Sequence, residues 1–216
     1  MEQFAIAESL KVHFSEEVLD SVSHQGQVGV VVRPERIVEV LSWLRDSEAM
    51  RMNHLRALCG VDNARRQVPF AGRFEVVYQL YSTALRHEIR IRVPLPKDKP
   101  QIDSVVSLWP GANWLERETY DMFGIFFKGH PNLNRVLLPE DWEGHPLQKD
   151  YPLKGKKEWQ GMVELVEKTK RLNQLGFYGQ KPTKKKESVQ TIKESVPAPP
   201  EELVPEENAP KTLRER

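Results

Sequence analysis

Three carboxylates lie close together near residue 120, and acids at such spacing are the first candidates for chemistry. Glu118 and Asp121 are three residues apart and share one face of a predicted helix, whereas Glu116 points elsewhere. Paired carboxylates can bind a divalent cation or divide the roles of general acid and general base. Arg117, four residues before Asp121, can instead neutralise it as an ion pair. We favour that structural interpretation, because neither a histidine nor a third acid completes a ligand set at helical spacing.

A Gly-His-Pro tripeptide occurs twice, at residues 129–131 and 144–146. Its histidines suggest a metal centre in a stand-alone enzyme, with four candidate ligands: Glu118, Asp121, His130 and His145. Each histidine, however, stands between a glycine that favours turns and a proline, Pro131 or Pro146, that fixes φ. We favour two rigid corners in which the imidazoles hydrogen-bond to nearby backbone.

Basic residues offer a third candidate site. Arg86, Arg90 and Arg92 share one face of a predicted strand, and residues 184–186 are three consecutive lysines. Binding to nucleic acid would use such groups, but Glu88 interrupts the arginine face and no aromatic residues are interleaved with it. The net charge of the chain is only +1. We therefore expect no nucleic-acid partner.

The other common catalytic templates are missing from the sequence, which has no GxGxxG, Walker, CxxC or G-x-S-x-G pattern. Cys59, the only cysteine, can form no internal disulfide and cannot supply the thiolates of a structural zinc or iron–sulfur site. His87 lies on the apolar face of its predicted strand and is typical of a core histidine. Residue chemistry thus favours an interaction protein over an enzyme.

Length and composition predict one sizeable domain with a tail. The chain has 216 residues, 39% of them hydrophobic, and a mean hydropathy of -0.57, so only part of it can be packed. No apolar run approaches the roughly 20 residues that a membrane-spanning helix needs. Glu2 stands where a signal peptide would carry positive charge. We expect a soluble chain, associated with any membrane only indirectly.

The elements that must position the acids begin with residues 1–24, which predict one or two short amphipathic helices. Residues 27–33 are a β-branched run and predict a strand, and residues 54–60 predict another. Pro34 opens a helix between these strands. The buried face of that helix has the spacing 0, +3, +4, +7 and comprises Ile37, Val40, Leu41 and Leu44.

Strict alternation of apolar and polar residues in 74–81 and 85–95 predicts a half-buried antiparallel pair joined by a turn at 82–84. Helices are predicted at 102–108 and 112–123. The order of the elements indicates an α+β fold over residues 1–123, with helices packed on a mainly antiparallel sheet.

Residues 124–155 contain glycines and prolines that forbid long regular elements. An irregular segment of this length, rich in aromatic residues, is expected to lie against a partner. A C-terminal helix is predicted within 156–180. Residues 181–216 have six prolines, alternating Lys and Glu clusters and no aromatic residue, so we expect a disordered tail.

The acid-rich helix and the residues after it resemble the signature of the 30 kDa subunit family of respiratory complex I, known in bacteria as the C-type subunits of NADH-quinone oxidoreductase. The matching residues are Glu116, Arg117, Glu118, Asp121, Met122, Phe123, His130, Arg135, Val136 and Leu137. Residues 143–153 are similar to a second block of the family, and the resemblance spans roughly 10–155. The sequence departs at Asn134 and Gln148, where the family often has basic residues, and each departure removes a possible salt bridge.

The resemblance implies a non-catalytic peripheral-arm subunit of a proton-translocating NADH:quinone oxidoreductase. It implies no cofactor in this chain, because FMN and the iron–sulfur clusters belong to neighbouring subunits. The implied place is the cytoplasmic side of the bacterial inner membrane, beside the 49 kDa-type (D-type) subunit. The expected interface comprises Glu116, Arg117, Glu118, Asp121, Phe123, Gly124, His130, Pro131, Arg135, His145, Pro146 and Asp150.

The partner is expected to bury four aromatic side chains of the extended segment: Phe123, Phe126, Phe127 and Trp142. An alternative within the same family is the equivalent subunit of a related membrane-bound hydrogenase or formate-oxidising complex.

Overall fold

The structure is a computed structural model that describes residues 3–66, 72–153, 155 and 159–174. It divides into two compact units, Met1–Gln160 and Gly161–Arg216. The tail predicted for 181–216 lies outside the described residues. In the described part of the chain, no helix combines the length and the apolar character that crossing a bilayer requires.

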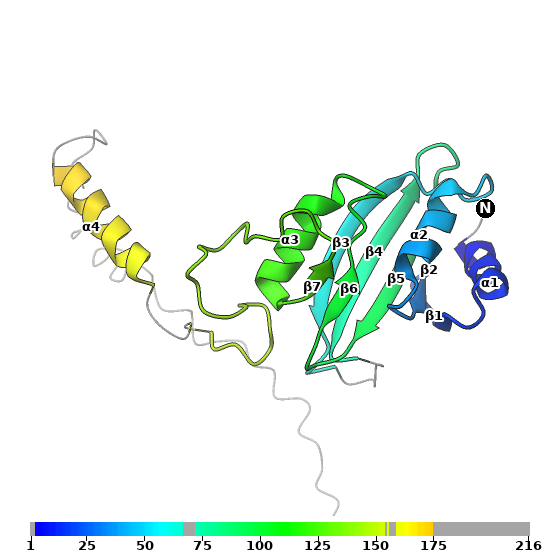
Figure 1. The fold of residues 1–216 in the computed structure, drawn as a ribbon, viewed down its shortest axis with the longest axis horizontal. Helices are drawn as coiled ribbons and strands as arrows, with labels where there is room; N and C mark the ends of the chain where they lie inside the picture. The colour runs from blue at the N-terminus through cyan, green and yellow to red at the C-terminus, as the bar shows by residue number, and fades with distance from the viewer. Residues whose placement is uncertain (1–2, 67–71, 154, 156–158, 175–216) are drawn as a thin grey trace, which may run out of the picture. The chain divides into compact units, whose positions relative to one another are not determined.

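The first unit is built on a five-stranded sheet with the order β1-β2-β5-β4-β3 (Figure 1). Its strands are β1 Val18–His24, β2 Gln27–Val32, β3 His54–Asp62, β4 Phe74–Ser82 and β5 His87–Leu95. Within this sheet, β2 and β5 pair in parallel, and the other neighbours are antiparallel. The predicted α+β class with a mainly antiparallel sheet is therefore confirmed.

Three helices share one core with the inner face of this sheet: α1 Gln3–His13, α2 Ile37–Asp46 and α3 Ala112–Phe123. The four apolar residues predicted for the face of α2 are all fully buried. The predicted alternation places every second side chain in the core, from Phe74 to Leu80 in β4 and from Ile89 to Leu95 in β5. Packing of this set against the helices removes apolar surface from water.

Two predictions of helix were wrong. Residues 18–24 form β1, which pairs with β2 through a tight turn at Gln25 and Gly26, both with positive φ. Residues 101–103 form β6 (Gln101–Asp103), which pairs in parallel with β7 (Phe126–Lys128). In both cases a partner strand decides the conformation, and short apolar runs do not distinguish strand from helix by themselves.

The hairpin turn also differs from the prediction. Strand β5 begins at His87, and Arg86 belongs to the turn, with φ 53°. Arg86 therefore does not share a strand face with Arg90 and Arg92. The predicted core role of His87 is confirmed, because it is buried and its Nε2 lies 2.7 Å from the Met50 carbonyl oxygen.

The irregular segment after α3 contains β7, and residues 129–153 that follow hold no helix or strand. Helix α4, Gln160–Gln174, lies within the range predicted for a C-terminal helix. Its apolar residues Met162, Leu165 and Val166 are exposed.

Candidate partner-binding site

Helix α3 carries the three acids and lies directly against the edge strand β3. A Cβ atom at Gly60 of β3 would come 2.7 Å from the Phe123 ring and 3.0 Å from the Thr119 side chain. Glycine at this position therefore allows the helix and the strand to approach closely. The approach brings the C-terminal end of α3 to the sheet and fixes the position of Asp121.

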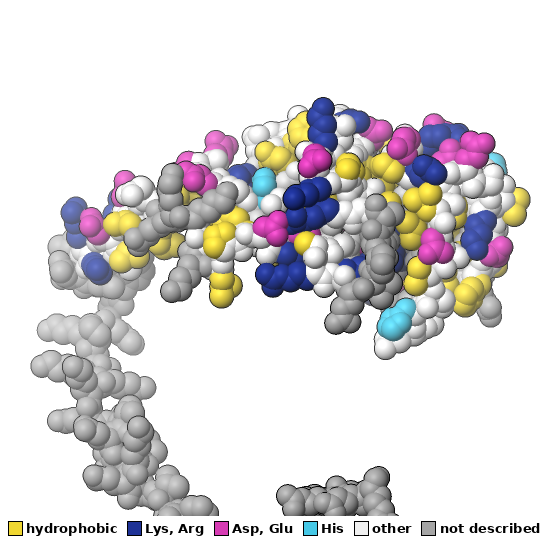
Figure 2. Space-filling view, turned by 90° about the horizontal axis from the view of Figure 1, so that it is seen from below, with side chains coloured by type: hydrophobic (Ala, Val, Ile, Leu, Met, Phe, Trp, Pro, Cys, Tyr) yellow, Lys and Arg dark blue, Asp and Glu magenta, His cyan; other side chains and the backbone are white. Residues whose placement is uncertain are grey.

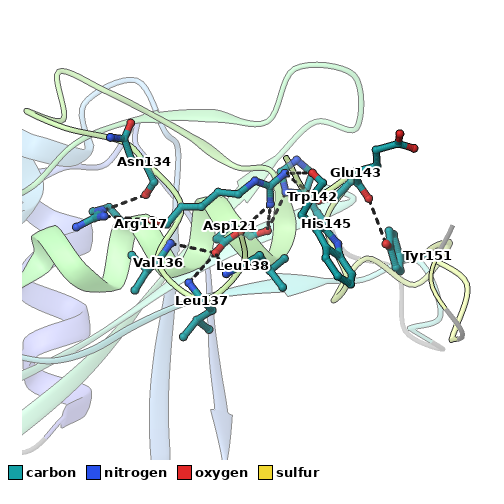
Figure 3. A network of polar contacts seen from close by, with 12 residues as sticks. Arg117, Asp121, Asn134, Val136, Leu137, Leu138, Trp142, Glu143, His145 and Tyr151 are labelled. Carbon is teal, nitrogen blue, oxygen red and sulfur yellow. Dashed lines mark hydrogen bonds and ion pairs between the residues drawn. The ribbon is translucent and has the colours of Figure 1, made fainter. Parts of the chain in front are cut away.

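Asp121 is fully buried and accepts four strong hydrogen bonds from a distant part of the chain (Figure 3). Its Oδ2 accepts the backbone N–H groups of residues 136, 137 and 138 at 3.1, 2.9 and 3.0 Å. Its Oδ1 accepts a hydrogen bond from Arg135 at 2.6 Å. Burial alone would raise the pKa of this carboxyl, but these hydrogen bonds together hold the pKa below its ordinary value. Asp121 is thus a structural anion around which the segment 135–138 is wrapped.

Arg135 completes this anchor by holding a second stretch of chain. One terminal nitrogen binds Asp121, and the other donates to the carbonyl oxygens of Trp142 and Gly144 at 3.0 and 3.1 Å. The side chain is 13% exposed. A planar guanidinium can satisfy several acceptors at fixed angles, whereas a lysine ammonium lacks that fork. Asp121 and Arg135 therefore fold residues 135–144 back onto α3.

The predicted ion pair between Arg117 and Asp121 was wrong. Arg117 donates instead to the backbone carbonyls of Asn134 and Arg135 at 3.0 and 3.1 Å, and its guanidinium lies 4.9 Å from the centre of the Trp114 ring. Spacing of four along a helix permits a contact, but Asp121 is occupied by a residue 14 positions later. The departure at Asn134 does not affect this contact, because only its backbone takes part.

The C-terminal end of α3 is closed by the second Gly-His-Pro block. The last four carbonyls of a helix lack partners within it, and here all four accept hydrogen bonds. The donors to residues 120, 121, 122 and 123, in that order, are Gly124 N, His145 Nδ1, Leu147 N and Gln148 Nε2, at 2.8, 2.9, 3.0 and 2.7 Å. Gln148, which departs from the family pattern, therefore serves as a helix cap.

Gly124 is required where the chain leaves α3. Its φ is 76°, in the left-handed region, and a Cβ there would lie 2.7 Å from the His145 ring. The carbonyl of Asp121 accepts from His145 Nδ1, so this imidazole carries its proton on Nδ1. The predicted structural role of His145 is confirmed.

His130 braces the other end of the helix. Its Nδ1 accepts the backbone N–H of Asn132 at 3.0 Å, which places the proton on Nε2, 3.2 Å from the Asn113 carbonyl oxygen. Asn113 and Asp121, the contacts of the two histidines, are eight residues apart, or about 12 Å along a helix. The two Gly-His-Pro corners therefore hold opposite ends of α3 and do not converge on one ion.

The other two acids of α3 also separate. Glu116 is fully buried and accepts hydrogen bonds from Ser104 Oγ and from the Val105 amide, both at 2.7 Å. Burial raises its pKa to about 7, although these two hydrogen bonds oppose the rise. Glu118 is exposed. Within the described ranges, no three His, Cys, Asp or Glu side chains are grouped so that they could hold a metal ion.

An ion cluster that sequence reasoning missed ties down the end of the segment. Asp62 of β3 accepts from Arg73 at 3.0 Å and from the Lys149 amide at 2.8 Å. Arg73 also donates to Asp150 at 2.6 Å. Burial opposes ionisation of Asp62, but its hydrogen bonds from Arg73 and backbone amides hold the pKa below its ordinary value. The antiparallel pairing of β3 with β4 brings Asp62 and Arg73 together, and no sequence motif marks them.

Several large apolar side chains face outward along α3 and residues 124–153, among exposed polar and charged ones. Exposed fractions reach 62% for Trp114, 51% for Phe126 and 60% for Leu137, and Leu147 and Leu153 are exposed as well. On the face drawn in Figure 2, hydrophobic side chains lie in small groups among charged ones. These five exposed apolar residues, Trp114, Phe126, Leu137, Leu147 and Leu153, are called the outer apolar surface.

Two aromatic residues expected to need a partner are instead held by the chain itself. Phe127 is 1% exposed and belongs to the core, and Phe123 packs against that core. Trp142 is half-buried. Of the four aromatic side chains expected at the interface, only Phe126 is exposed.

Comparisons with known proteins identify the family to which the chain is similar. Residues 30–157 match the family model described as respiratory-chain NADH dehydrogenase, 30 Kd subunit. The C-type subunit of NADH-quinone oxidoreductase from Roseiflexus sp. (strain RS-1) is 48% identical over 153 residues, which cover 71% of this chain and 86% of the relative. The corresponding protein of Citrifermentans bemidjiense is 47% identical over 146 residues, covering 68% and 87%. Among solved structures, the trypsin-resistant fragment (1-134) of Nqo5 is 32% identical, with a TM-score of 0.54, over 62% of this chain and 100% of the fragment.

Proposed function

The chain belongs to the 30 kDa subunit family of respiratory-chain NADH dehydrogenase, and from this premise we propose how it serves its complex. It is a peripheral, C-type subunit of NADH-quinone oxidoreductase, and its role there is to join other subunits rather than to carry electrons. FMN and the iron–sulfur clusters are assigned to neighbouring subunits. Relatives named as C-type subunits of NADH-quinone oxidoreductase favour this respiratory complex over the hydrogenase-type alternative.

One observation carries the proposal: most of the polar residues of the signature and of the block after it have their hydrogen-bond partners inside the chain. Asp121, Arg135, His145 and Gln148 bind backbone groups or one another. A catalytic acid or base must reach a substrate, whereas these side chains are already bonded to groups of the chain itself. They hold residues 124–153 in a fixed shape that presents large apolar side chains outward, among polar ones. A rigid apolar surface suits a permanent protein partner.

The partner proposed for this surface is the 49 kDa-type (D-type) subunit. The exposed Trp114 stacks with Arg117, and large aromatic and arginine side chains are the types that dominate binding energy at interfaces. Through this contact the chain is held on the cytoplasmic side of the bacterial inner membrane. The signature residues then act as the support of the interface, with the outer apolar surface as its contact face.

Native co-purification from membranes tests this assignment. A double variant, Trp114→Ala with Leu137→Ala, is compared with Val12→Ala, which removes an exposed apolar side chain of α1 that is 84% exposed. Loss of a hot-spot side chain costs about 2 kcal/mol or more, about a thirtyfold weaker association. We expect the double variant to deplete assembled complex in the membrane while turnover per assembled complex stays normal. The control should assemble fully.

Charge reversal at Asp121, which supports the interface from within the chain, tests the same proposal. Asp121→Lys should release residues 135–138 and block assembly, and any complex that does form should turn over normally. Normal assembly with abolished turnover would place chemistry at Asp121 and overturn the structural role. Stoichiometric zinc, iron or manganese in the purified chain would overturn it as well.

A further inference from the structure

The outer face of the sheet, opposite the helices, holds a feature that the proposed function does not use. The structure describes no helix on this face. Its strands form an open hollow of about 830 Å³, with side chains from all five strands in its lining. We call it the sheet hollow and define it by the six charged residues that line it: Arg56, Arg66, Glu75, Glu88, Arg90 and Arg92.

Positive charge exceeds negative charge in the sheet hollow. Four arginines face two glutamates, an excess of two positive charges. Two arginines contact Glu75: Arg92 binds it through two nitrogens, and Arg66 lies 3.6 Å away. Glu88 is paired with Arg56 at 3.0 Å. Both carboxylates are thus already engaged by arginines.

Arg90 is held by neutral groups. Its Nε donates to Gln79 at 3.1 Å and a terminal nitrogen donates to Gln27 at 2.6 Å. Amide oxygens orient a guanidinium but do not neutralise it. Arg90 therefore presents an oriented positive charge within the hollow.

The arginines are also fixed in advance. Arg92 is 12% exposed and Glu75, which binds it, is 1% exposed. At Gly29 a Cβ would lie 3.2 Å from Arg92 Cδ, so a larger residue there would crowd the arginine stem. Side chains that are already ordered lose little entropy when a ligand binds. Ala57, Val61 and Val77 add an apolar strip beside them.

We propose that the sheet hollow docks an extended acidic segment, with apolar residues between its carboxylates, from a neighbouring subunit of the complex. The positive charge of Arg90, which amide oxygens orient, matches a carboxylate, and the apolar strip matches the apolar residues beside it. A polyanion such as nucleic acid would instead meet Glu75 and Glu88 and a chain of net charge +1. The proposal rests on the proposed function, but the hollow lies on the other face of the sheet from α3.

Cys59 supplies a built-in probe of this site. It is the only cysteine of the chain, its side chain is exposed, and it lines the sheet hollow. Neighbouring side chains partly desolvate its thiol and raise the pKa, so labelling is done at pH 8 to 8.5, where enough thiolate forms. The experiment compares the rate of maleimide labelling of Cys59 in complex purified from membranes with the rate in the purified full chain.

We expect labelling in the complex to be at least about tenfold slower than in the free chain, with the protection weakened by high salt, because exposed charge pairs are screened. Arg90→Gln should weaken the protection, whereas Arg51→Gln, a change at an exposed arginine outside the hollow, should not. A photoreactive maleimide on Cys59 should then cross-link to a Glu- or Asp-rich segment of another subunit.

Three results would overturn the proposal. Equal labelling rates in complex and free chain would leave the hollow uncovered. Protection that neither salt nor Arg90→Gln changes would mean an uncharged occupant. A cross-link to this chain's own residues 199–208, which are also acidic, would make the occupant internal. Failure to obtain any complex would count against the proposed function and not against the hollow.

Discussion

Replacing Asp121 by asparagine is the most direct test of how the segment 135–148 is held. The substitution preserves size and one carbonyl oxygen, which can still accept the N–H groups of residues 136–138. The amide nitrogen then faces Arg135, whose terminal nitrogen lies 2.6 Å from the present Oδ1. Two donors would meet there, and the arginine would keep a buried charge without its carboxylate.

The size of the effect follows from burial. Asp121 is fully buried and Arg135 is 13% exposed. Breaking such a pair by removing one charge costs about 3–5 kcal/mol. We expect the lower end, about 3 kcal/mol, because the backbone hydrogen bonds survive. At 1.36 kcal/mol per factor of ten, this is about a hundredfold increase in the opening of the segment.

Native-state hydrogen exchange measures this opening. The amides of residues 136–138 are protected by their bonds to Asp121, so their exchange should become about a hundred times faster in Asp121→Asn. Exchange in β4 should change much less, since the carboxylate holds a surface segment and not the sheet. Glu118→Gln is the matched control, because it removes the same charge from an exposed position of the same helix.

Unchanged exchange at residues 136–138 would refute the reasoning, since it would mean that the buried charge contributes little to holding the segment. Equal acceleration in Glu118→Gln would also refute it, because the effect would then arise from net charge. A uniform loss of protection through β4 would show that Asp121 supports the whole domain.

Two further predictions concern α3. Gly124→Ala should lower the free energy of urea unfolding by about 1–3 kcal/mol, because φ is 76° and the new Cβ would collide with His145; Gly111→Ala, with nothing within 4 Å, is the control and should be near neutral. The stability of Glu116→Gln relative to the wild type should increase when the pH is raised from 5 to 8. The folded carboxyl has its pKa raised from 4.5 to about 7, so wild-type stability falls as pH rises between these values, by up to about 3 kcal/mol, while the glutamine does not titrate. An equal difference between Glu116→Gln and wild type at both pH values would contradict this.

Local pattern was sufficient for the elements that bury one face. The spacing of Ile37, Val40, Leu41 and Leu44 predicted α2, and alternation predicted β4 and β5, because the period of burial follows from backbone geometry alone. It failed for β1 and β6, which are strands because of the partners they meet. The range 18–24 has exposed positions along most of its length, so its burial carries no period.

Polar partners were harder to predict than polar roles. Asp121, His130 and His145 were correctly expected to be structural, since no ligand set closes at their spacing. Their partners lay elsewhere: Asp121 binds Arg135 and not Arg117, and Asp150 binds Arg73, 77 residues earlier. A helix rule describes neighbours within one element, whereas these contacts depend on the path of a loop.

The amino-acid sequence by itself determined the family, the α+β class and the concentration of signature residues in 116–153. Only the tertiary structure decided that Asp121, Arg135 and His145 bind groups inside the chain, that Phe127 belongs to the core while Trp114 and Leu137 face out, and that the arginines of β5 border a hollow. The physical reason is the separation of the interacting groups along the sequence. Periodicity and composition act over a few residues and can be read in order, but each hydrogen bond to Asp121 joins groups at least 14 residues apart, which only the folded chain brings together.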